Sequence, residues 1–533
     1  MNNRSPWVRV SLAALLASSL AHAAPQGEAA AQAELAAPAG VAAPAAPAAA
    51  ATDTPGEAIG ANNTVLLAIR NNPALAASIL SVSQASSDVR AEEGLYSPVL
   101  RANAGITHTE SPGLRSDGVS VTNSDTIDLG AGISKQFSTG TIVDLDIGTQ
   151  RSLRTSEIDP TTSLNTRLGP GYSLAAQLSV TQPLLRGAWN DIGLASLRSA
   201  RISERATRLA ATQAASSLVR DVLIAYWELW YSDQVLRINQ SSRDLAREQA
   251  RQAQEQVKSG SLAPADALTY LTRSAELDET VLASNTDRYQ RALNVGLLVG
   301  DPGRGGGFVA SDAPEEPGGA SEPMNTTIAQ ALTSSPELAQ LEQNVAFAEE
   351  QLKIAGDALR PRLDLTAAVG VAGLGNQRLP PAFDQVGNLD AVSASVGLTF
   401  EAPLSDQRRK SQVASARYAS QISQKQVDST RQRLQNDVMV AYALRNTALE
   451  RMNVTRETVR VAEEQAEAER QRFTAGASIA IVVQQAEDSL RQAKLRLERA
   501  RVDWTQAEID LAHLSGRLLS RYREALERVE QAG

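Results

Sequence analysis

Several segments of the chain alternate apolar and polar residues with a period of two, the pattern of a β-strand with one apolar face. The alternation runs through residues 99–107, 127–133, 143–147, 174–180, 363–371 and 392–401. Between two of these segments, Ser138-Thr139-Gly140 predicts a hairpin turn. The longer runs approach the roughly 9–11 residues of a transmembrane β-strand. A soluble antiparallel sheet half-buried on a core has the same period, so the pattern alone leaves both structures open.

Much of the remaining sequence predicts unusually long helices. No Gly or Pro occurs in the 66 residues from Leu194 to Ser259, or in the 72 residues from Leu404 to Ala475. Helices of this length would extend roughly 100 Å and need a supercoiled partner to bury their apolar stripe. One such stripe has apolar residues spaced alternately three and four apart, at Leu490, Ala493, Leu497, Ala500, Trp504, Ala507, Leu511 and Leu514. Charged residues on the other faces, such as Arg491 and Arg499, are interpreted as solvated.

The chain contains a long internal duplication. Asn71-Asn72-Pro73-Ala74-Leu75 recurs as Ser334-Ser335-Pro336-Glu337-Leu338, and each copy continues through alternating segments into a long helix. From Asp221 to Gly300 the first copy matches the second at a constant offset of 216 residues. A repeat of this kind predicts a duplicated helix–strand–strand–helix unit.

The duplication divides the chain into segments. Residues 1–23 are predicted to be a signal peptide, 24–55 an Ala/Pro-rich disordered spacer, 301–323 a linker and 520–533 a C-terminal tail. The first repeat, 56–300, is expected to have strands within about 98–183 and long helices at 188–258 and 264–299. The second repeat, 324–519, is expected to have strands within about 362–403 and long helices at 404–474 and 478–515.

The signal peptide has a basic start, a short apolar run and a small-x-small cleavage site at Ala21-His22-Ala23. Cleavage there removes Arg4 and Arg9, so the net charge falls from −9 to −9 − 2 = −11. No later stretch offers the roughly 18 consecutive apolar residues of a transmembrane helix. If the chain spans a membrane, we therefore expect a β-barrel, because barrels satisfy every backbone hydrogen bond without a helix.

Composition argues against enzyme chemistry. The chain has no Cys and three His, of which His22 lies in the predicted leader. We therefore predict no catalytic, cofactor-binding or metal-binding residues, and no cofactor. The negative charge gives no sign of a nucleic-acid partner. The glycine-rich stretch Gly303-Arg304-Gly305-Gly306-Gly307 follows a helix and lacks phosphate-loop spacing, so it is interpreted as linker.

The ordered set of motifs resembles the TolC-like outer-membrane efflux protein family over roughly residues 60–520. The matched features are the duplication itself, Tyr96-Ser97-Pro98, Thr181-Gln182-Pro183-Leu184-Leu185-Arg186-Gly187, Val257-Lys258-Ser259-Gly260 and Phe473-Thr474-Ala475-Gly476. The resemblance implies a mostly α fold with membrane β: a homotrimer with a 12-stranded β-barrel, continued by a long α-helical coiled-coil tunnel in the periplasm. It also implies an adaptor (membrane fusion) protein and an inner-membrane pump as partners, with outer-membrane lipid around the barrel.

The strand number agrees with a trimer but leaves one segment unassigned. Two strands per copy give four per chain, which cannot close a barrel with a lumen, whereas three chains give twelve. The first copy, however, devotes about twice as many residues to strands, Val99–Gln182 against Arg362–Ala402. The extra hairpin near 127–147 could enlarge the barrel, lengthen one strand pair or lie outside the membrane.

The family resemblance also implies a gate at the periplasmic helix tips. Asp266, six residues after Gly260, matches an acid that the family uses in links between protomers; it equally suits a helix N-terminus after Pro264. Val482 and Gln485 occupy positions where the family has aspartates, and Ser478 replaces a basic residue. A gate closed by packing of Val482 and hydrogen bonds from Gln484 or Gln485 is therefore expected, rather than an acidic ring.

The tips, at Gly260, Ser261, Leu262, Gly476 and Ala477, are predicted to reverse the chain and, by resemblance, to dock the adaptor. The leading hypothesis is a passive exit duct for small molecules or polypeptides in a tripartite efflux or type I secretion system. The alternative is a periplasmic coiled-coil scaffold with a soluble sheet and no pore. A secreted enzyme has little support, since no catalytic motif is present. The cargo stays open, with metal slightly disfavoured because Met is rare and Cys absent.

Overall fold

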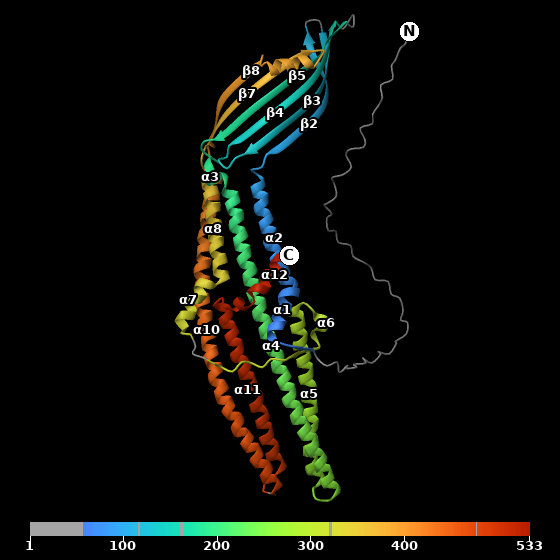
Figure 1. Cartoon of the computed structure of the whole chain (residues 1–533), viewed down its shortest axis with the longest axis vertical. Coiled ribbons are helices and arrows are strands. Elements are labelled where there is room, and N and C mark those ends of the chain that lie inside the picture. Colours follow the sequence, from blue (N-terminus) through green and yellow to red (C-terminus); the bar gives the residue numbers. More distant parts are fainter. Residues whose placement is uncertain (1–56, 116–117, 160–163, 319–321, 476, 533) are drawn as a thin grey trace, which may run out of the picture. The chain divides into compact units, whose positions relative to one another are not determined.

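Two long helical hairpins and one six-stranded sheet are the largest parts of the described chain, and shorter helices and a two-stranded sheet accompany them (Figure 1). The computed structural model describes residues 57–532, except 116–117, 160–163, 319–321 and 476. The predicted signal peptide, 1–23, and spacer, 24–55, lie outside these residues, as does Gly476. The residues from Glu57 onward belong to a single compact unit.

The first hairpin consists of α4 (Ala195–Lys258) and α5 (Pro264–Val299), and the second of α10 (Gln407–Thr474) and α11 (Ala480–Leu514). The partners within each hairpin pack along their length, and α4 also packs on α11, which joins the two hairpins. The apolar stripe predicted on the second hairpin is the buried seam of α11: Ala493, Leu497, Ala500, Trp504, Ala507 and Leu511 are buried. Many of these residues are Ala, so the helix axes can approach closely.

The duplication predicted from sequence is present in the short helices. In the first repeat α1 (Ala61–Asn71) and α2 (Pro73–Gly94) have 11 and 22 residues, and in the second α7 (Met324–Ser334) and α8 (Pro336–Asp357) have the same lengths. The side chain of Asn72 accepts hydrogen bonds from the backbone N–H of Ala74 and Leu75, and that of Ser335 accepts one from Leu338. Each capping residue precedes a Pro in the first helical turn, where the missing N–H of the Pro costs no hydrogen bond.

A glycine ends the second helix of each hairpin and contacts the first helix of the same repeat. Gly300 has φ +83° and Gly516 has φ +72°, which is left-handed backbone that a side chain disfavours. A Cβ on Gly300 would lie 2.5 Å from the carbonyl oxygen of Asn71, and one on Gly516 would lie 2.9 Å from that of Ser334. In both repeats, therefore, the end of the hairpin lies so close to the end of the first short helix that only Gly fits there.

The sheet has the order β2-β3-β4-β5-β7-β8, and every neighbouring pair is antiparallel. Its strands are β2 (Val99–Arg115), β3 (Gly118–Gln136), β4 (Ile142–Asp159), β5 (Leu164–Pro183), β7 (Arg362–Asn376) and β8 (Val392–Glu401). The expectation of four strands per chain is wrong, because the segment near 127–147 forms β3 and β4 and joins the same sheet. The second repeat supplies the expected two strands, with α9 (Pro380–Gly387) between them.

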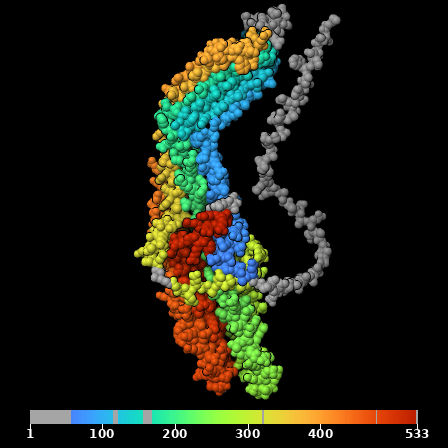
Figure 2. Space-filling view, in the orientation of Figure 1, coloured from blue at the N-terminus to red at the C-terminus, as the bar shows by residue number. Residues whose placement is uncertain are grey.

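The segments expected to be linker and tail contain ordered elements. Residues 301–323 include α6 (Pro302–Gly305) and β6 (Phe308–Ala310), and β6 pairs in parallel with β1 (Glu57–Ile59). The Tyr226 hydroxyl joins both segments to α4, accepting from Asp312 N (2.9 Å) and donating to Ile59 O (3.1 Å). At the C-terminus, η1 (Leu518–Arg521) and α12 (Arg523–Ala532) lie beside α1, as Figure 2 shows. Leu518 and Tyr522 are buried in the same core as Val65 and Ile69.

Within the described ranges, no single helix is long and apolar enough to cross a membrane. The helices α1 and α2, which meet at 49°, are long and apolar enough only when they are taken together.

Candidate functional site

The hairpin tips have a common backbone structure. After α4, Gly260 has φ +76° and the N–H of Ser261 bonds to the carbonyl of Gln256 at 2.9 Å. After α10, the N–H of Ala477 bonds in the same way to the carbonyl of Arg472 at 2.8 Å. This bond over five residues is the usual way to end a helix at a left-handed residue. Gly260, Ser261 and Ala477 are exposed and Leu262 is half-buried, so both tips are open to a partner.

The residues predicted to form the gate lie on both hairpins near the tips. Asp266 is exposed in the first turn of α5, where it suits the helix dipole. Ser478 lies just before α11 and donates a hydrogen bond to Glu469 of α10 at 2.9 Å. It therefore steadies its own turn.

The other three predicted gate residues lie in the first turns of α11. Val482 is half-buried and Gln485 is exposed. Gln484 is half-buried, and its buried Nε2 has no hydrogen-bond partner within the described residues. A buried amide donor without a partner costs free energy, and this nitrogen lies inside its own chain, out of reach of a neighbouring molecule in this conformation.

Two adjacent acids slightly further along α11 join the hairpins. Arg273 of α5 donates to Asp488 at 2.6 Å, and Arg491 of α11 donates to the same carboxylate at 2.8 Å. Burial opposes ionisation of Asp488, but the hydrogen bonds from Arg491 and Arg273 outweigh it and lower the pKa of the carboxyl from its ordinary value. Asp488 is therefore ionised at neutral pH and holds two helices from different repeats.

The neighbouring acid, Glu487, joins a different pair of helices. It accepts hydrogen bonds from Gln249 of α4 and Arg470 of α10, each at 3.0 Å. One turn beyond, Arg491 also reaches the buried Asn239 of α4 at 3.2 Å. Glu487, Asp488 and Arg491, here called the tip cluster, thus connect α4, α5, α10 and α11 near their free ends.

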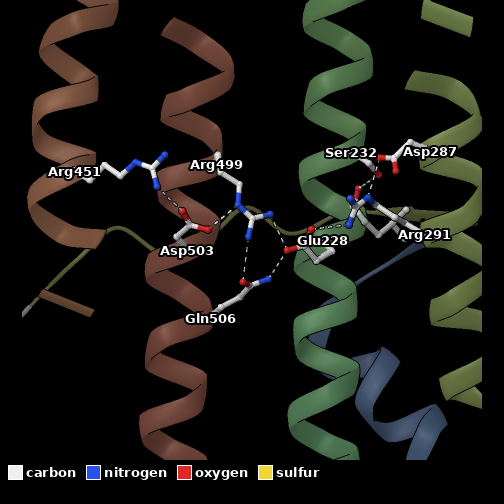
Figure 3. Close-up of polar contacts among 9 residues, drawn as sticks. Glu228, Ser232, Asp287, Arg291, Arg451, Arg499, Asp503 and Gln506 are labelled. Atoms are coloured by element: carbon white, nitrogen blue, oxygen red, sulfur yellow. Dashed lines mark hydrogen bonds and ion pairs between the residues drawn. The ribbon is translucent and has the colours of Figure 1, made fainter. Parts of the chain in front are cut away.

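A second polar cluster lies further from the tips and is drawn in Figure 3. Glu228 of α4 accepts from Arg291 of α5 at 2.6 Å, and from Arg499 and Gln506 of α11 at 2.8 and 2.7 Å. Burial favours the neutral acid, but these donors and the charges of Arg499 and Arg291 outweigh it and lower the pKa of Glu228.

The Glu228 cluster also reaches the fourth helix. Arg499 donates to Asp503 at 2.7 Å, and Asp503 accepts from Arg451 of α10 at 3.2 Å (Figure 3). The cluster therefore clamps all four long helices at one level.

These clusters correct one interpretation made from the sequence. Arg491 and Arg499 were expected to be solvated, but their side chains are only 17% and 32% exposed. Arg499 is ion-paired with Glu228 of α4, whereas Arg491 is ion-paired within α11 and hydrogen-bonded to Asn239 of α4. Glu487 and Asp488 were not singled out at all. The pair of adjacent acids two turns into the helix was visible in the sequence, but only the packing of α11 against α4 and α5 gives them partners.

Solved structures of outer membrane proteins have a fold similar to that of this chain. The Campylobacter jejuni CmeC channel matches with a TM-score of 0.65 at 12% identity, over 88% of this chain and 89% of that one. VceC of Vibrio cholerae matches with 0.62 at 16% identity, over 86% and 96%. The open state of the Neisseria gonorrhoeae MtrE channel matches with 0.59 at 17% identity, over 86% and 89%. Likenesses at such identities show the fold. No curated protein matches the sequence.

A family described as "Outer membrane efflux protein" matches residues 327–517. The match covers most of the second repeat. The family resemblance expected from the sequence is confirmed for these residues. The matched range contains Ser478, Val482, Gln484 and Gln485 and the whole tip cluster. The first repeat lies outside the matched range but has the same pairs of short and long helices.

Proposed function

We propose that this protein is the outer-membrane exit duct of a tripartite efflux or type I secretion system. In this proposal three copies of the chain form one barrel in the outer membrane and one helical tunnel in the periplasm. Small molecules or polypeptides pass through the duct passively, and an inner-membrane pump supplies the energy. An adaptor protein links the pump to the tips at Gly260–Leu262 and Gly476–Ala477.

The observation that carries the proposal is the apolar face of the sheet, which among the described elements is covered only in part, by α9 beside β5 and β7. Leu145 and Leu178 lie in the central strands β4 and β5, yet they are 41% and 46% exposed on the same face. On the opposite face the same two strands carry Asp144, Asp146 and Gln177. A soluble sheet of this size would cover its apolar face with another layer. In a membrane barrel, lipid outside covers the apolar face and water inside solvates the polar face, so no further layer is needed.

The edges of the sheet support the trimer. β2 and β8 are the outer strands of the sheet, and each is paired on one side only among the described residues. Both carry exposed apolar residues, with Leu100 at 74% and Val396 at 77%. An unpaired edge is unstable in lipid, so an edge of one copy is expected to pair with the other edge of the next.

Closure at the tips is assigned to two sets of residues. Asp266, Ser478, Val482, Gln484 and Gln485 surround the narrowest part of the duct in this proposal. The tip cluster holds the two hairpins of each subunit together behind that constriction. Opening then requires the hairpins to separate near their tips while the Glu228 cluster keeps the helices together further up.

The competing function is a periplasmic coiled-coil scaffold without a pore. It accounts for the long helices, but it gives the apolar face of the sheet no use. A scaffold would be recovered in the soluble fraction, whereas a duct needs detergent and is expected to run as a heat-modifiable trimer.

The deciding experiment is single-channel conductance of the detergent-extracted protein in a planar bilayer, beside the variant Val482→Asp/Gln485→Asp. The duct predicts discrete openings, and the acidic variant is expected to gain block by multivalent cations at the constriction. A silent protein is then tested with Arg273→Ala/Gln249→Ala, which removes the bond of Asp488 to α5 and that of Glu487 to α4. Continued silence of folded trimers after that change would favour the scaffold.

A further inference from the structure

The hairpin of β3 and β4 lies within the sheet, between β2 and β5 (Figure 1). β2 is paired with β3 along its whole length of 17 residues, and β4 is paired with β5 from Ile142 to Asp159. The hairpin therefore separates two strands that would otherwise be neighbours in the first repeat. It does not fold back on the sheet or project from its end.

The hairpin continues the apolar face at the same levels as the rest of the sheet. Following the strand registers from β2 to β8 gives rows of residues that share one face. One row is Leu100, Ile133, Leu145, Leu178, Val369 and Ala394. The next row is Ala102, Ala131, Ile147, Ala176, Val371 and Val392. All twelve residues are apolar, so the inserted strands match the membrane-facing surface of their neighbours.

The other face ties the hairpin to β2 across a strand. Arg101 of β2 donates to Asp144 of β4 at 2.9 Å, although β3 lies between them. The intervening residue is Gly132, where a Cβ would lie 2.2 Å from the carboxylate of Asp146. The missing side chain lets the guanidinium pass over β3, and the contact spans three strands that lie side by side in one sheet.

The insertion preserves the alternation and register of the sheet. The hairpin contributes two strands, so the number of strands per chain is even. Because neighbouring strands alternate in direction, β8 of one copy then runs antiparallel to β2 of the next. If the hairpin were removed, the registers would leave Leu100 level with Leu178 and Ala104 level with Leu174. The two strands could then pair directly with their apolar faces still matched.

We propose that the hairpin of β3 and β4 widens the barrel, so that three copies enclose it with 3 × 6 = 18 strands instead of twelve. The proposal rests on the trimeric duct proposed above. Barrel diameter grows roughly linearly with strand number, so the barrel is about half again as wide. The hairpin adds no helix, and the tunnel at the tips keeps the width set by α4, α5, α10 and α11. The restriction on cargo therefore lies at the tips and not in the barrel.

The first test compares the full chain with a variant lacking residues 118–159, which removes β3 and β4 and leaves 116–117 and 160–163 as the loop. Both are imaged as detergent-solubilised particles by electron cryomicroscopy, and the strands around the barrel are counted. We expect 18 strands in the full chain and twelve in the variant. A full-length trimer with twelve strands in its wall would overturn the proposal.

A second test needs only the full chain and does not depend on folding of the shortened one. The chain has no Cys, so paired substitutions report unambiguously. Asp146→Cys/Gln177→Cys joins directly opposite residues of β4 and β5 and should form a disulfide on mild oxidation. Arg101→Cys/Gln177→Cys spans three strand spacings, about 14 Å, and should not. Formation of the second disulfide in the full chain would show that β2 neighbours β5 and would overturn the insertion.

These readouts are independent of conductance. An 18-stranded trimer that stays silent even as Arg273→Ala/Gln249→Ala would overturn the duct and leave the widened wall standing. A conducting trimer with twelve strands would do the opposite.

Discussion

Arg273 of α5 and Asp488 of α11 form a 2.6 Å ion pair that joins the first and second repeats near the free ends of their hairpins. Their side chains are 24% and 28% exposed, so the pair is partly shielded from solvent. It lies between the exposed turns and the Glu228 cluster, where a contact between the hairpins can control their separation with little effect on the rest of the bundle.

Replacing Arg273 by Ala should increase opening of the duct. An ion pair with this exposure contributes up to about 1 kcal/mol, so we expect the open population to rise by up to about fivefold. The measurement is the open probability of single channels in a planar bilayer. Arg251→Ala is the matched control, because Arg251 pairs only with Glu248 one turn away on the same helix. Equal open probabilities for the two variants would show that the tip cluster does not hold the gate closed.

Glu228→Gln should destabilise the bundle by about 2 kcal/mol, because three charged or polar donors lose their carboxylate. The pKa of Glu228 is lowered on folding, so its contribution is present above its ordinary pKa of 4.5 and is lost as the pH falls through the folded value. Thermal unfolding followed by circular dichroism should show the difference between wild type and variant shrinking in acid below that pH. The exposed Glu457→Gln serves as control, and a pH-independent difference would contradict the role of the charge.

His513 should make the protein sensitive to mild acid. Burial, reinforced by the charge of Arg220, lowers the pKa of His513 in spite of Asp510 and Asp221. The unfolded chain therefore binds a proton more readily than the folded one, and stability falls as the pH drops below about 6.5. We expect the unfolding temperature of wild type to fall between pH 7 and 5.5, and that of His513→Gln to fall less. If the unfolding temperatures of wild type and variant fell in parallel with pH, His513 would not be the cause of the acid sensitivity.

The two ends of a hairpin should differ in their tolerance of a side chain. Gly260→Ala places a Cβ in open space, so it should cost only the left-handed backbone, about 1 kcal/mol. Gly300→Ala has the same backbone cost and also a clash with the carbonyl of Asn71, so its unfolding temperature should be clearly lower. Gly516→Ala should resemble Gly300→Ala if the repeats are equivalent. Equal effects at Gly260 and Gly300 would contradict the close approach.

The periodic features of this protein follow from local sequence. Alternation at Leu100–Ile106 and Val392–Phe400 specifies strands with one apolar face, because successive side chains of a strand point to opposite sides. The absence of Gly and Pro from Leu194 to Ser259 specifies one long helix, α4, and the spacing from Ala493 to Leu511 specifies the buried stripe of another, α11. Asn72 and Ser335 before prolines specify two helix starts and reveal the repeat.

The position of the extra hairpin was decided only by tertiary structure. Residues 127–147 alternate equally well inside a sheet or outside it, and the pairing of β3 with β2 and of β4 with β5 joins segments whose register no local pattern states. The polar clusters depended on packing for the same reason. Arg499 on an isolated helix is a solvated charge, and it becomes a link between Glu228 and Asp503 only because α11 lies against α4. Local sequence determines which face of an element is apolar, whereas the partners of its polar face depend on contacts between residues far apart in the chain.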